Sequence, residues 1–312
     1  MSKTEAFSNR LRKNSKHWDK WARRQGLSCY RLYDRDLPEF PLAVDRYAQH
    51  LHVQEFETDW EADDAAYDGW REACFVVLSE VLEVPRERIH FKQRRRQRGL
   101  AQYEKTGETG EDFIVEEYGL KFWVNLDTYL DSGLFLDHRI TRRLVRERAA
   151  GTRFLNLFAY TGSFTVYAAA GGALSSVTVD MSNTYQDWSR RNFLLNGMDL
   201  DSHQLVRADV FQFLREAHER GDRFDLIVMD PPSFSNSKKM QGVLDVQRDH
   251  VELIEACLRI LSAEGELFFS NNRRGFKLDE AALAGHTIRN LSRQTVPEDF
   301  SNKKIHQCWI IL

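Results

Sequence analysis

Residues 153–163 read Arg-Phe-Leu-Asn-Leu-Phe-Ala-Tyr-Thr-Gly-Ser, and the rest of the chain is organised around this stretch. Its nearly continuous apolar run, 154–158, is typical of a strand that is buried on both faces of a parallel sheet. The run ends in a turn that carries Gly162, and a helix of small residues, 163–170, follows. A strand, a tight glycine turn and a helix open a nucleotide-binding βαβ unit, in which the ligand lies beyond the carboxyl end of the strand.

The turn and the acid that follows it narrow the class of nucleotide. A dinucleotide-binding turn has repeated glycines that let the backbone approach a pyrophosphate, whereas this turn has one, so a dinucleotide is disfavoured. The next predicted strand, 176–179, ends in Asp180, where a carboxylate can accept hydrogen bonds from both ribose hydroxyls. These two features suit a nucleoside without phosphates, such as S-adenosylmethionine. An ordinary α/β crossover with a surface aspartate fits them equally well.

Length and composition exclude several classes of protein. The 312 residues, 42% hydrophobic and 29% charged, describe a soluble globular protein with two domains or one domain and an added lobe. No apolar run reaches membrane-spanning length, and the charged segment after Met1 is unlike a signal peptide, so we expect no membrane association. The four cysteines are far apart and lack the spacing of metal ligands, which predicts no metal site and a cytoplasmic location.

Two segments ahead of the core are rich in basic residues, although the net charge of the whole chain is only −3. Residues 9–25 have the periodicity of a helix with an apolar stripe and many Lys and Arg residues beside it. Residues 92–98 read Lys-Gln-Arg-Arg-Arg-Gln-Arg, next to a polar, turn-rich stretch at 99–110. Both segments could be solvated surface, but we favour contact with RNA phosphates. The predicted RNA-binding residues are Arg10, Arg12, Lys13, Lys16, Arg94, Arg95, Arg96 and Arg98.

Three regions are predicted along the chain: a basic helical segment at 1–40, a small α+β lobe at 41–128, and a doubly wound α/β domain at 129–312. In the lobe, which we expect to bind RNA, the predicted elements are a hairpin at 42–56, a helix at 60–82, a strand at 89–92 and a second hairpin at 113–126. In the third region, the predicted strands are 204–207, 224–229 and 265–270, the predicted helices are 139–149, 185–196, 210–220 and 246–261, and the predicted closing strand pair is 286–294 with 305–312.

The motif that narrows the chemistry is Asp230-Pro231-Pro232-Ser233-Phe234, which follows the predicted strand 224–229. Two prolines cannot continue a strand ladder, and they hold a rigid turn. The Asp230 carboxylate and the proline carbonyls can accept hydrogen bonds from a base edge, and Phe234 can stack on the base. Such a turn also occurs by chance, but its place two strands after a candidate ribose acid favours a base-binding role.

Residues 153–270 resemble a Rossmann-like S-adenosylmethionine-dependent methyltransferase, with 156–163 as its first motif. Almost the whole chain resembles the C-terminal, guanine-N7 (RlmK) half of the bifunctional bacterial 23S rRNA guanine methyltransferases, the RlmKL family. The stretches that carry this resemblance are 7–14, 29–34, 133–139, 230–238, 245–250 and 269–276. The N-terminal half of that family, with an N2-guanine methyltransferase, is absent, so the chain is either a fragment or one part of a split enzyme.

The resemblance implies an α/β fold with a mostly parallel seven-stranded sheet and a small N-terminal α+β lobe. It implies S-adenosylmethionine as methyl donor, S-adenosylhomocysteine as product, and 23S rRNA or a large-subunit precursor as substrate, methylated at guanine N7 without a covalent intermediate. Residues implied to contact the cofactor are Asp137, Arg139, Phe158, Tyr160, Gly162, Ser163, Asp180, Met181, Asp209, Val210 and Asp230. Asp137 could equally be a helix N-terminal acid, while Arg139 could bind the carboxylate of the ligand.

Other reactions remain open at this point. Residues 133–139, which we call the approach segment, begin with a Gly-x-Phe-Leu-Asp pattern that cytosine-C5 rRNA methyltransferases share. Those enzymes use a cysteine nucleophile after the fifth strand, where this chain has Ser270-Asn271-Asn272. Cys257 and Cys308 are predicted to be packing residues. N2-guanine or N6-adenine methylation would also suit the Asp-Pro-Pro turn. A non-enzymatic RNA-binding module is disfavoured by the cofactor residues.

Overall fold

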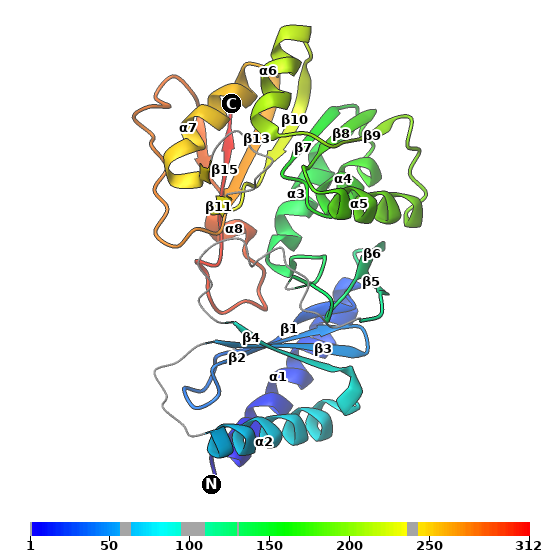
Figure 1. The fold of residues 1–312 in the computed structure, drawn as a ribbon, viewed down its shortest axis with the longest axis vertical. Helices are drawn as coiled ribbons and strands as arrows, with labels where there is room; N and C mark the ends of the chain where they lie inside the picture. Colours follow the sequence, from blue (N-terminus) through cyan, green and yellow to red (C-terminus); the bar gives the residue numbers. More distant parts are fainter. Residues whose placement is uncertain (1, 57–63, 95–109, 130, 236–242) are drawn as a thin grey trace. The chain divides into compact units, whose positions relative to one another are not determined.

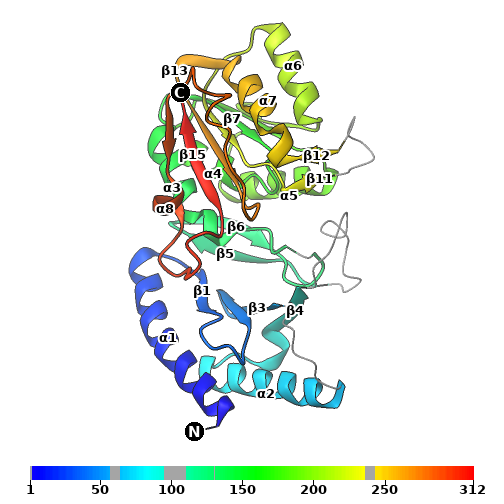
Figure 2. The same ribbon diagram turned by 90° about the vertical axis from the view of Figure 1, so that its left-hand side faces the viewer.

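The structure is a computed structural model that describes residues 2–56, 64–94, 110–129, 131–235 and 243–312. Its chain divides into two compact units. The first comprises Met1–Gly119, Val124–Ser132 and Glu298–Asn302, and the second comprises Leu120–Trp123, Gly133–Pro297 and Lys303–Leu312. Figure 1 and Figure 2 show the elements of both units. Among the described residues, no helix combines the length and hydropathy needed to cross a membrane.

The first unit is a four-stranded sheet with the strand order β1-β2-β3-β4 and two helices packed on it. β1, β2 and β3 are antiparallel, and β4 joins β3 in parallel. The bounds are α1 Lys3–Gln25, β1 Cys29–Asp34, β2 Leu42–Tyr47, β3 His50–Phe56, α2 Asp64–Leu82, the 3-10 helix η1 Arg86–Arg88, β4 Ile89–Arg94 and β5 Phe113–Glu117. The predicted first hairpin, the end of the long helix and the strand after it are confirmed, whereas β1 was not predicted.

The basic helix α1 is longer than predicted because it begins at Lys3 instead of Asn9. Ser2 and Glu5 form a capping box, in which the Ser2 hydroxyl accepts from the Glu5 N–H and the Glu5 carboxylate accepts from the Ser2 N–H. Reciprocal caps of this kind satisfy two backbone donors that a helix start otherwise leaves unpaired. The predicted apolar stripe packs on the sheet, with Phe7 and Leu11 fully buried.

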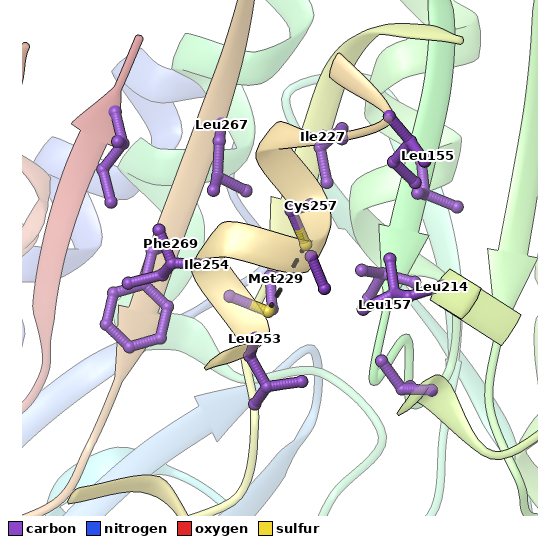
Figure 3. Packing of buried hydrophobic residues seen from close by; sticks show 14 of the residues in the cluster. Leu155, Leu157, Leu214, Ile227, Met229, Leu253, Ile254, Cys257, Leu267 and Phe269 are labelled. Atoms are coloured by element: carbon purple, nitrogen blue, oxygen red, sulfur yellow. Dashed lines mark hydrogen bonds between the residues drawn. The ribbon is translucent and has the colours of Figure 1, made fainter. Parts of the chain in front are cut away.

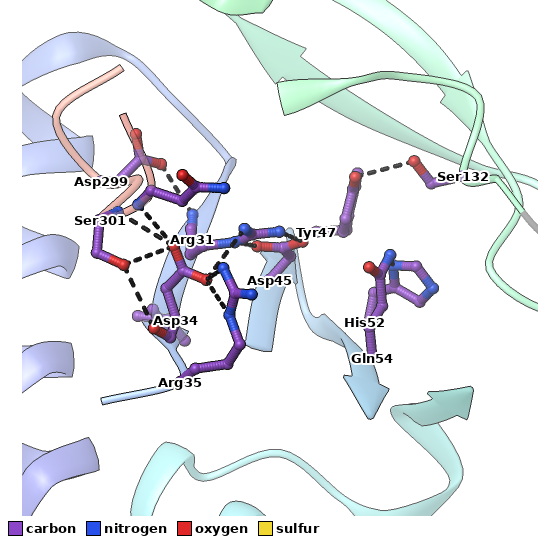
Figure 4. Close-up of polar contacts among 12 residues, drawn as sticks. Arg31, Asp34, Arg35, Asp45, Tyr47, His52, Gln54, Ser132, Asp299 and Ser301 are labelled. Atoms are coloured by element: carbon purple, nitrogen blue, oxygen red, sulfur yellow. Dashed lines mark hydrogen bonds and ion pairs between the residues drawn. The ribbon is translucent and has the colours of Figure 1, made fainter. Parts of the chain in front are cut away.

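A buried polar network ties the returning segment Glu298–Asn302 to the sheet of the first unit (Figure 4). Asp299 accepts the backbone N–H of Arg31 at 2.8 Å, and Ser301 of the same segment donates through its hydroxyl to Asp34 at 2.7 Å. The Arg31 guanidinium binds both oxygens of Asp45, at 2.7 and 2.9 Å. Burying charges is costly unless they are paired, so these partners allow β1 to lie inside the unit.

The second unit contains a seven-stranded sheet with the order β14-β15-β13-β10-β7-β8-β9. The five strands β13, β10, β7, β8 and β9 are parallel, and β15 runs antiparallel to both of its neighbours. The sheet is therefore mostly parallel, as predicted from the sequence. The strands are β6 Leu120–Val124, β7 Arg153–Leu157, β8 Ser175–Val179, β9 His203–Val206, β10 Phe224–Met229, β11 Phe234–Ser235, β12 Leu244–Asp245, β13 Leu261–Asn271, β14 Ile288–Asn290 and β15 Gln307–Ile311. The helices are η3 Leu136–His138, α3 Arg139–Arg148, α4 Ser163–Ala170, α5 Asn183–Leu195, α6 Val210–Arg220, α7 Val246–Leu258 and α8 Ser292–Thr295.

Helices cover both faces of this sheet, and successive strand residues point to opposite faces. On one face, Leu157 of β7 and Met229 of β10 pack against α6 and α7, where the thiol of Cys257 lies 3.7 Å from the Met229 sulfur (Figure 3). On the other face, Phe154 and Val228 pack against α3 and α4. Burial on both faces explains the continuous apolar runs of these strands.

Two predictions near the end of the chain were wrong. The predicted helix 246–261 ends at Leu258, because Leu261 already pairs with Phe224 as the first residue of β13. The predicted strand 286–294 is β14 for three residues only, and α8 then begins. The Asn290 side chain accepts the Ser292 N–H at 2.9 Å, a local turn that competes with continued strand pairing. The antiparallel pairing of β14 with β15 is confirmed.

The strand order reverses between β7 and β10, because the chain runs outward from β7 through β8 to β9 and then returns to β10 on the other side. In open α/β sheets, ligands bind beyond the carboxyl ends of the strands at this topological switch point. The turn after β7 and the acids after β8, β9 and β10 all belong to that edge of the sheet.

Candidate active site

The turn after β7 has an unusual backbone. Phe158 and Tyr160 have φ values of 56° and 52°, and Gly162 has a φ of 71°. Positive φ is unfavourable for residues with a side chain, and such strain concentrates at ligand-binding sites. A Cβ atom on Gly162 would lie 2.8 Å from the Phe193 ring and 2.9 Å from the Ser189 hydroxyl of α5, so only glycine fits there. The turn is therefore shaped by its packing against α5.

A second segment, around Gly133, holds the same turn. The Gly133 N–H donates to the Tyr160 hydroxyl at 2.9 Å, and the Thr161 hydroxyl donates to the Gly133 carbonyl at 2.6 Å. A Cβ on Gly133 would lie 2.3 Å from the Trp188 ring, so this close approach also requires glycine. Phe135 packs against Tyr160 with ring centroids 5.1 Å apart and is 37% exposed. The stretch Gly-Leu-Phe-Leu-Asp-His-Arg thus reaches the predicted cofactor turn.

Asp180 follows β8 and lies directly beside this turn. Its two carboxylate oxygens accept the N–H groups of Tyr160 and Ser182, each at 2.9 Å. A carboxylate has about four lone-pair positions, so these bonds leave room for further donors such as a hydroxyl group. Burial raises the pKa of Asp180 to about 6, although the backbone N–H groups act in the opposite direction. This arrangement fits the ribose of S-adenosylmethionine.

The other predicted cofactor residues have defined local roles. Asp209 is the N-cap of α6, and one of its oxygens accepts the Gln212 N–H at 3.0 Å. The Met181 carbonyl accepts from the Arg207 guanidinium at 3.2 Å. Val210 is buried as the first residue of α6, and Ser163 is the first residue of α4. All of them lie after β7, β8 or β9 in sequence, as the predicted site requires, but none of these contacts identifies a ligand by itself.

Asp137 and Arg139, the two predicted cofactor contacts that precede β7, have other surroundings. Asp137 is bonded to His306, whose Nδ1 lies 3.0 Å from its carboxylate. Arg139 begins α3 and is fully buried. A group that binds a polar ligand normally faces solvent when the ligand is absent, so nothing in the position of Arg139 favours the predicted contact with a ligand carboxylate.

The Asp-Pro-Pro turn after β10 has its carboxylate held from two sides. The Ser270 hydroxyl, near the end of β13, donates to one oxygen of Asp230 at 2.7 Å. The other oxygen lies 3.5 Å from Nε2 of His138. Pro231 is buried and Pro232 is half-buried, which fixes the turn. Phe234 is 47% exposed, as a stacking residue would need to be.

His138, which contacts this turn, stacks on a second histidine, His306. The rings of His138 and His306 are 4.4 Å apart and nearly parallel at 11°. Asp137, His138 and His306 bring three potential metal-ligand atoms within 4.8 Å of one another. However, both ring nitrogens of His306 already contact other groups, Asp137 at 3.0 Å and Thr295 at 2.9 Å. In-plane lone pairs of parallel rings also converge poorly on one ion, so we describe this cluster as a hydrogen-bonded network.

All four cysteines are buried, as predicted for the two that were weighed as nucleophiles. Burial raises the pKa of the Cys257 and Cys308 thiols well above the ordinary value. Because a thiolate is the nucleophilic form, these thiols are unsuited to covalent catalysis.

The predicted RNA-binding residues fall into two groups. On α1, Arg12, Lys13 and Lys16 are exposed, while Arg10 lies 3.9 Å from Asp36. Arg94 is the last residue of β4. The remaining three, Arg95, Arg96 and Arg98, lie outside the described residues.

Sequence reasoning missed Ser270 and His138 as neighbours of Asp230, and His306 as the neighbour of His138. The carboxyl-end rule could have found Ser270, because it lies near the end of the fifth parallel strand. His138 lies within the approach segment, but no sequence pattern links this residue to Asp230. His306 is separated from Asp137 by 169 positions, so no local pattern could reveal their contact.

Comparison with known proteins agrees with this geometry. The model of the S-adenosylmethionine-dependent methyltransferase family matches residues 83–304. The chain is 57% identical over 311 residues to the ribosomal RNA large subunit methyltransferase K of Neisseria meningitidis serogroup B, covering 100% of this chain and 88% of that protein. It is 53% identical to the ribosomal RNA large subunit methyltransferase K/L of Methylococcus capsulatus, covering 99% of this chain but 42% of that protein.

Solved structures support the same fold. A methyltransferase crystallised with S-adenosylhomocysteine superposes with a TM-score of 0.78 at 25% identity, covering 100% of this chain and 82% of that chain. A methyltransferase from Agrobacterium tumefaciens shares the fold with a TM-score of 0.60 at 17% identity, covering 86% of each chain. The predicted Rossmann-like methyltransferase fold is thereby confirmed.

Proposed function

The chain belongs to the S-adenosylmethionine-dependent methyltransferases, in the group of ribosomal RNA large subunit methyltransferases K and K/L, and we propose from this premise that it methylates guanine N7 in 23S rRNA. The observation that carries the proposal is the 57% identity to methyltransferase K, in a match that spans 100% of this chain. The K/L relative supports the same substrate class, although the chain spans only 42% of its length.

S-adenosylmethionine is the cofactor, and when bound it supplies an electrophilic methyl group on a positively charged sulfur. Three groups of this chain suit it. The turn at 158–162 offers a close backbone approach beyond β7. The Asp180 carboxylate is the acceptor for the ribose hydroxyls, and Asp209 is the candidate partner of the adenine amino group.

Guanine N7 has an in-plane lone pair, so it needs neither a general base nor a covalent enzyme intermediate for direct in-line attack. The task of the protein is then proximity and orientation. Asp230 and the carbonyls of Pro231 and Pro232 accept hydrogen bonds from the base edge, and Phe234 stacks on the base face. The anionic Asp230 also favours the positive charge that develops on the purine.

Cytosine-C5 methylation is the less suitable reaction for this site. That chemistry needs a thiolate close to the base, and Cys257 and Cys308 are fully buried. The position after β13, where the related C5 enzymes carry cysteine, is Ser270-Asn271-Asn272 in this chain. Direct attack by a ring nitrogen requires no such residue.

We assign RNA phosphate contacts to the exposed basic residues of α1 and, as a second segment, to the arginines that follow β4. The substrate is a large polyanion, and phosphate contacts supply most of the affinity in such complexes. A ribosomal RNA substrate also implies a cytoplasmic location in a bacterium.

The proposal is tested with purified protein, 23S rRNA that lacks its own modifications, and S-adenosylmethionine. The RNA is digested to nucleosides, and mass spectrometry identifies the methylated product. We expect N7-methylguanosine. N2-methylguanosine, N6-methyladenosine or C5-methylcytidine would each contradict the proposed acceptor atom while retaining the methyltransferase activity. Absence of product with the Asp230→Asn variant and its presence with wild type would tie the reaction to this turn.

A further inference from the structure

We propose that His138 is a positioning residue for methyl transfer, acting through Asp230 of the Asp-Pro-Pro turn. The inference rests on the proposed function, because it assigns a partner to the residue that we expect to orient the target base. It connects a residue of the approach segment to the Asp-Pro-Pro turn.

The contact geometry supports a two-sided clamp on Asp230. The Ser270 hydroxyl donates to Oδ1 at 2.7 Å, and Nε2 of His138 lies 3.5 Å from Oδ2. Each carboxylate oxygen therefore has one neighbour on the protein side. The Asp230 side chain is 27% exposed, so it remains accessible to a ligand. Two partners on two oxygens favour a single carboxylate rotamer, which is what orientation of a base edge requires.

His138 is itself held rigidly. It is the last residue of η3, is almost completely buried, and stacks on His306 on one side. The Phe164 ring approaches it edge-on with centroids 5.8 Å apart. Among the described residues, its Nδ1 has no hydrogen-bond partner, although the atom is buried. An unpaired buried nitrogen is costly, and a purely structural position would be better filled by an apolar side chain.

The charges around the ring favour the tautomer that the clamp needs. Burial lowers the pKa of His138, and His306 and Arg142 act in the same direction, whereas Asp230 and Asp137 oppose it. The imidazole is therefore neutral near pH 7 and carries one N–H. Placing this hydrogen on Nε2 directs it at the two nearby carboxylates, 3.5 Å from Asp230 and 3.9 Å from Asp137. The alternative tautomer would turn a lone pair toward both carboxylates.

Two substitutions separate positioning from packing. His138→Gln keeps an N–H donor close to the position of Nε2, and His138→Leu keeps the volume without any donor. We expect the Leu variant to lower kcat at least about tenfold, because the polar contact of Nε2 with the Asp230 carboxylate is lost and a misplaced orienting group slows the reaction steeply. The Gln variant should retain most of kcat, and the Kd for S-adenosylmethionine should change less than about threefold in both. The matched control is His203→Gln. His203 is buried and pairs with Ser176 at the amino ends of β8 and β9, away from the carboxyl ends that carry the site.

Methyl transfer is measured as tritium incorporated into rRNA from labelled S-adenosylmethionine. This readout counts any methylated atom, so an error in the N7 assignment leaves the comparison valid. Equal losses of kcat in the Leu and Gln variants would overturn the proposal, because they would indicate a packing role. A loss of cofactor affinity that matches the loss of kcat would overturn it as well. That result would show that His138 supports the whole strand edge, including the cofactor site, and does not act through Asp230.

An NMR measurement without substrate tests the contact itself. In protein labelled with nitrogen-15 at histidine, the His138 ring should be the neutral Nε2–H tautomer, and its Nε2 signal should shift in Asp230→Asn. Asp180→Asn, which changes another strand-end carboxylate, should leave the signal unchanged. If Asp230→Asn has no effect on this signal, the clamp does not exist. If wild type transfers no methyl to rRNA, the proposed function fails, while this arm still decides whether His138 and Asp230 are coupled.

Discussion

Affinity for S-adenosylmethionine should depend on pH through the ionisation of Asp180. Burial raises the pKa of this carboxyl to about 6, and its oxygens already accept two backbone N–H groups at 2.9 Å. In the proposed complex the ribose hydroxyls donate to the carboxylate, so bound cofactor should favour the ionised form. The ionised form is the minority below the raised pKa and the majority above it, and cofactor binding must therefore weaken as the pH falls through about 6.

The size of the change in Kd follows from the raised pKa of Asp180. At about pH 5, roughly nine-tenths of the carboxyl is protonated in the free protein, whereas at about pH 7 roughly nine-tenths is ionised. If the complex holds the carboxylate ionised at both values, the Kd at about pH 5 should be about tenfold larger than at about pH 7. Binding at the lower pH should also release a proton, because the group titrates as the ligand docks.

Calorimetry measures both quantities. The Kd is determined at the two pH values, and the proton release is obtained from the heats in two buffers with different ionisation enthalpies. Asp180→Asn is the control, since its amide does not titrate, and its weaker binding should be independent of pH over this range. Equal wild-type affinity at both pH values, or the same pH dependence in the Asn variant, would refute the assignment of Asp180 to the ribose.

Further predictions concern stability, the thiols and RNA. Arg31→Met should lower the free energy of unfolding by about 3–5 kcal/mol in urea titrations, because it leaves buried Asp45 unpaired. The control Arg86→Met removes an equally short but exposed pair with Glu72 and should have no measurable effect. Similar losses of stability in both variants would contradict the burial argument. Cys308→Ala should keep turnover within about tenfold of wild type in the tritium assay, because a buried thiol with a raised pKa is not the nucleophile; a stable, cofactor-binding variant without turnover would contradict this. Alanine at three exposed positions of α1 should lower the slope of log RNA affinity against log salt by about two, measured by filter binding, with no change in cofactor affinity, and an unchanged slope would show that α1 is only solvated. The α1 positions are Arg12, Lys13 and Lys16, and the control is the exposed basic set of Arg215, Arg220 and Arg223.

The part of the fold that follows from local pattern was predictable from the sequence. Buried parallel strands are short and apolar, so β7 and β10 were found from their runs, and the helix 210–220 was predicted with the bounds that the structure has. The acids that follow these strands then fall on one edge, because parallel strands share their carboxyl ends. The contacts of Asp180 with the β7 turn agree with that expectation.

The features that escaped prediction depend on partners far away in the sequence. β1 carries Arg31 and Asp34 inside a buried strand, and these charges are tolerated only because Asp45 and the segment Glu298–Asn302 pair with them. The histidine stack depends in the same way on His306, which comes from the end of the chain. β13 begins before the predicted residue 265 because Leu261 pairs with Phe224 on the neighbouring strand. The hydrophobic periodicity of the sequence does not predict this pairing.

The proposed reaction of this chain is methylation of N7 of a guanine in 23S rRNA. The most direct measurement is mass spectrometry of nucleosides from 23S rRNA of a deletion strain, complemented either with the wild-type gene or with the Asp230→Asn variant. We expect one N7-methylguanosine to disappear on deletion, to return with the wild-type gene and not to return with the variant. Unchanged N7-methylguanosine in the deletion strain, or loss of a different methylated nucleoside in its place, would contradict the proposed reaction.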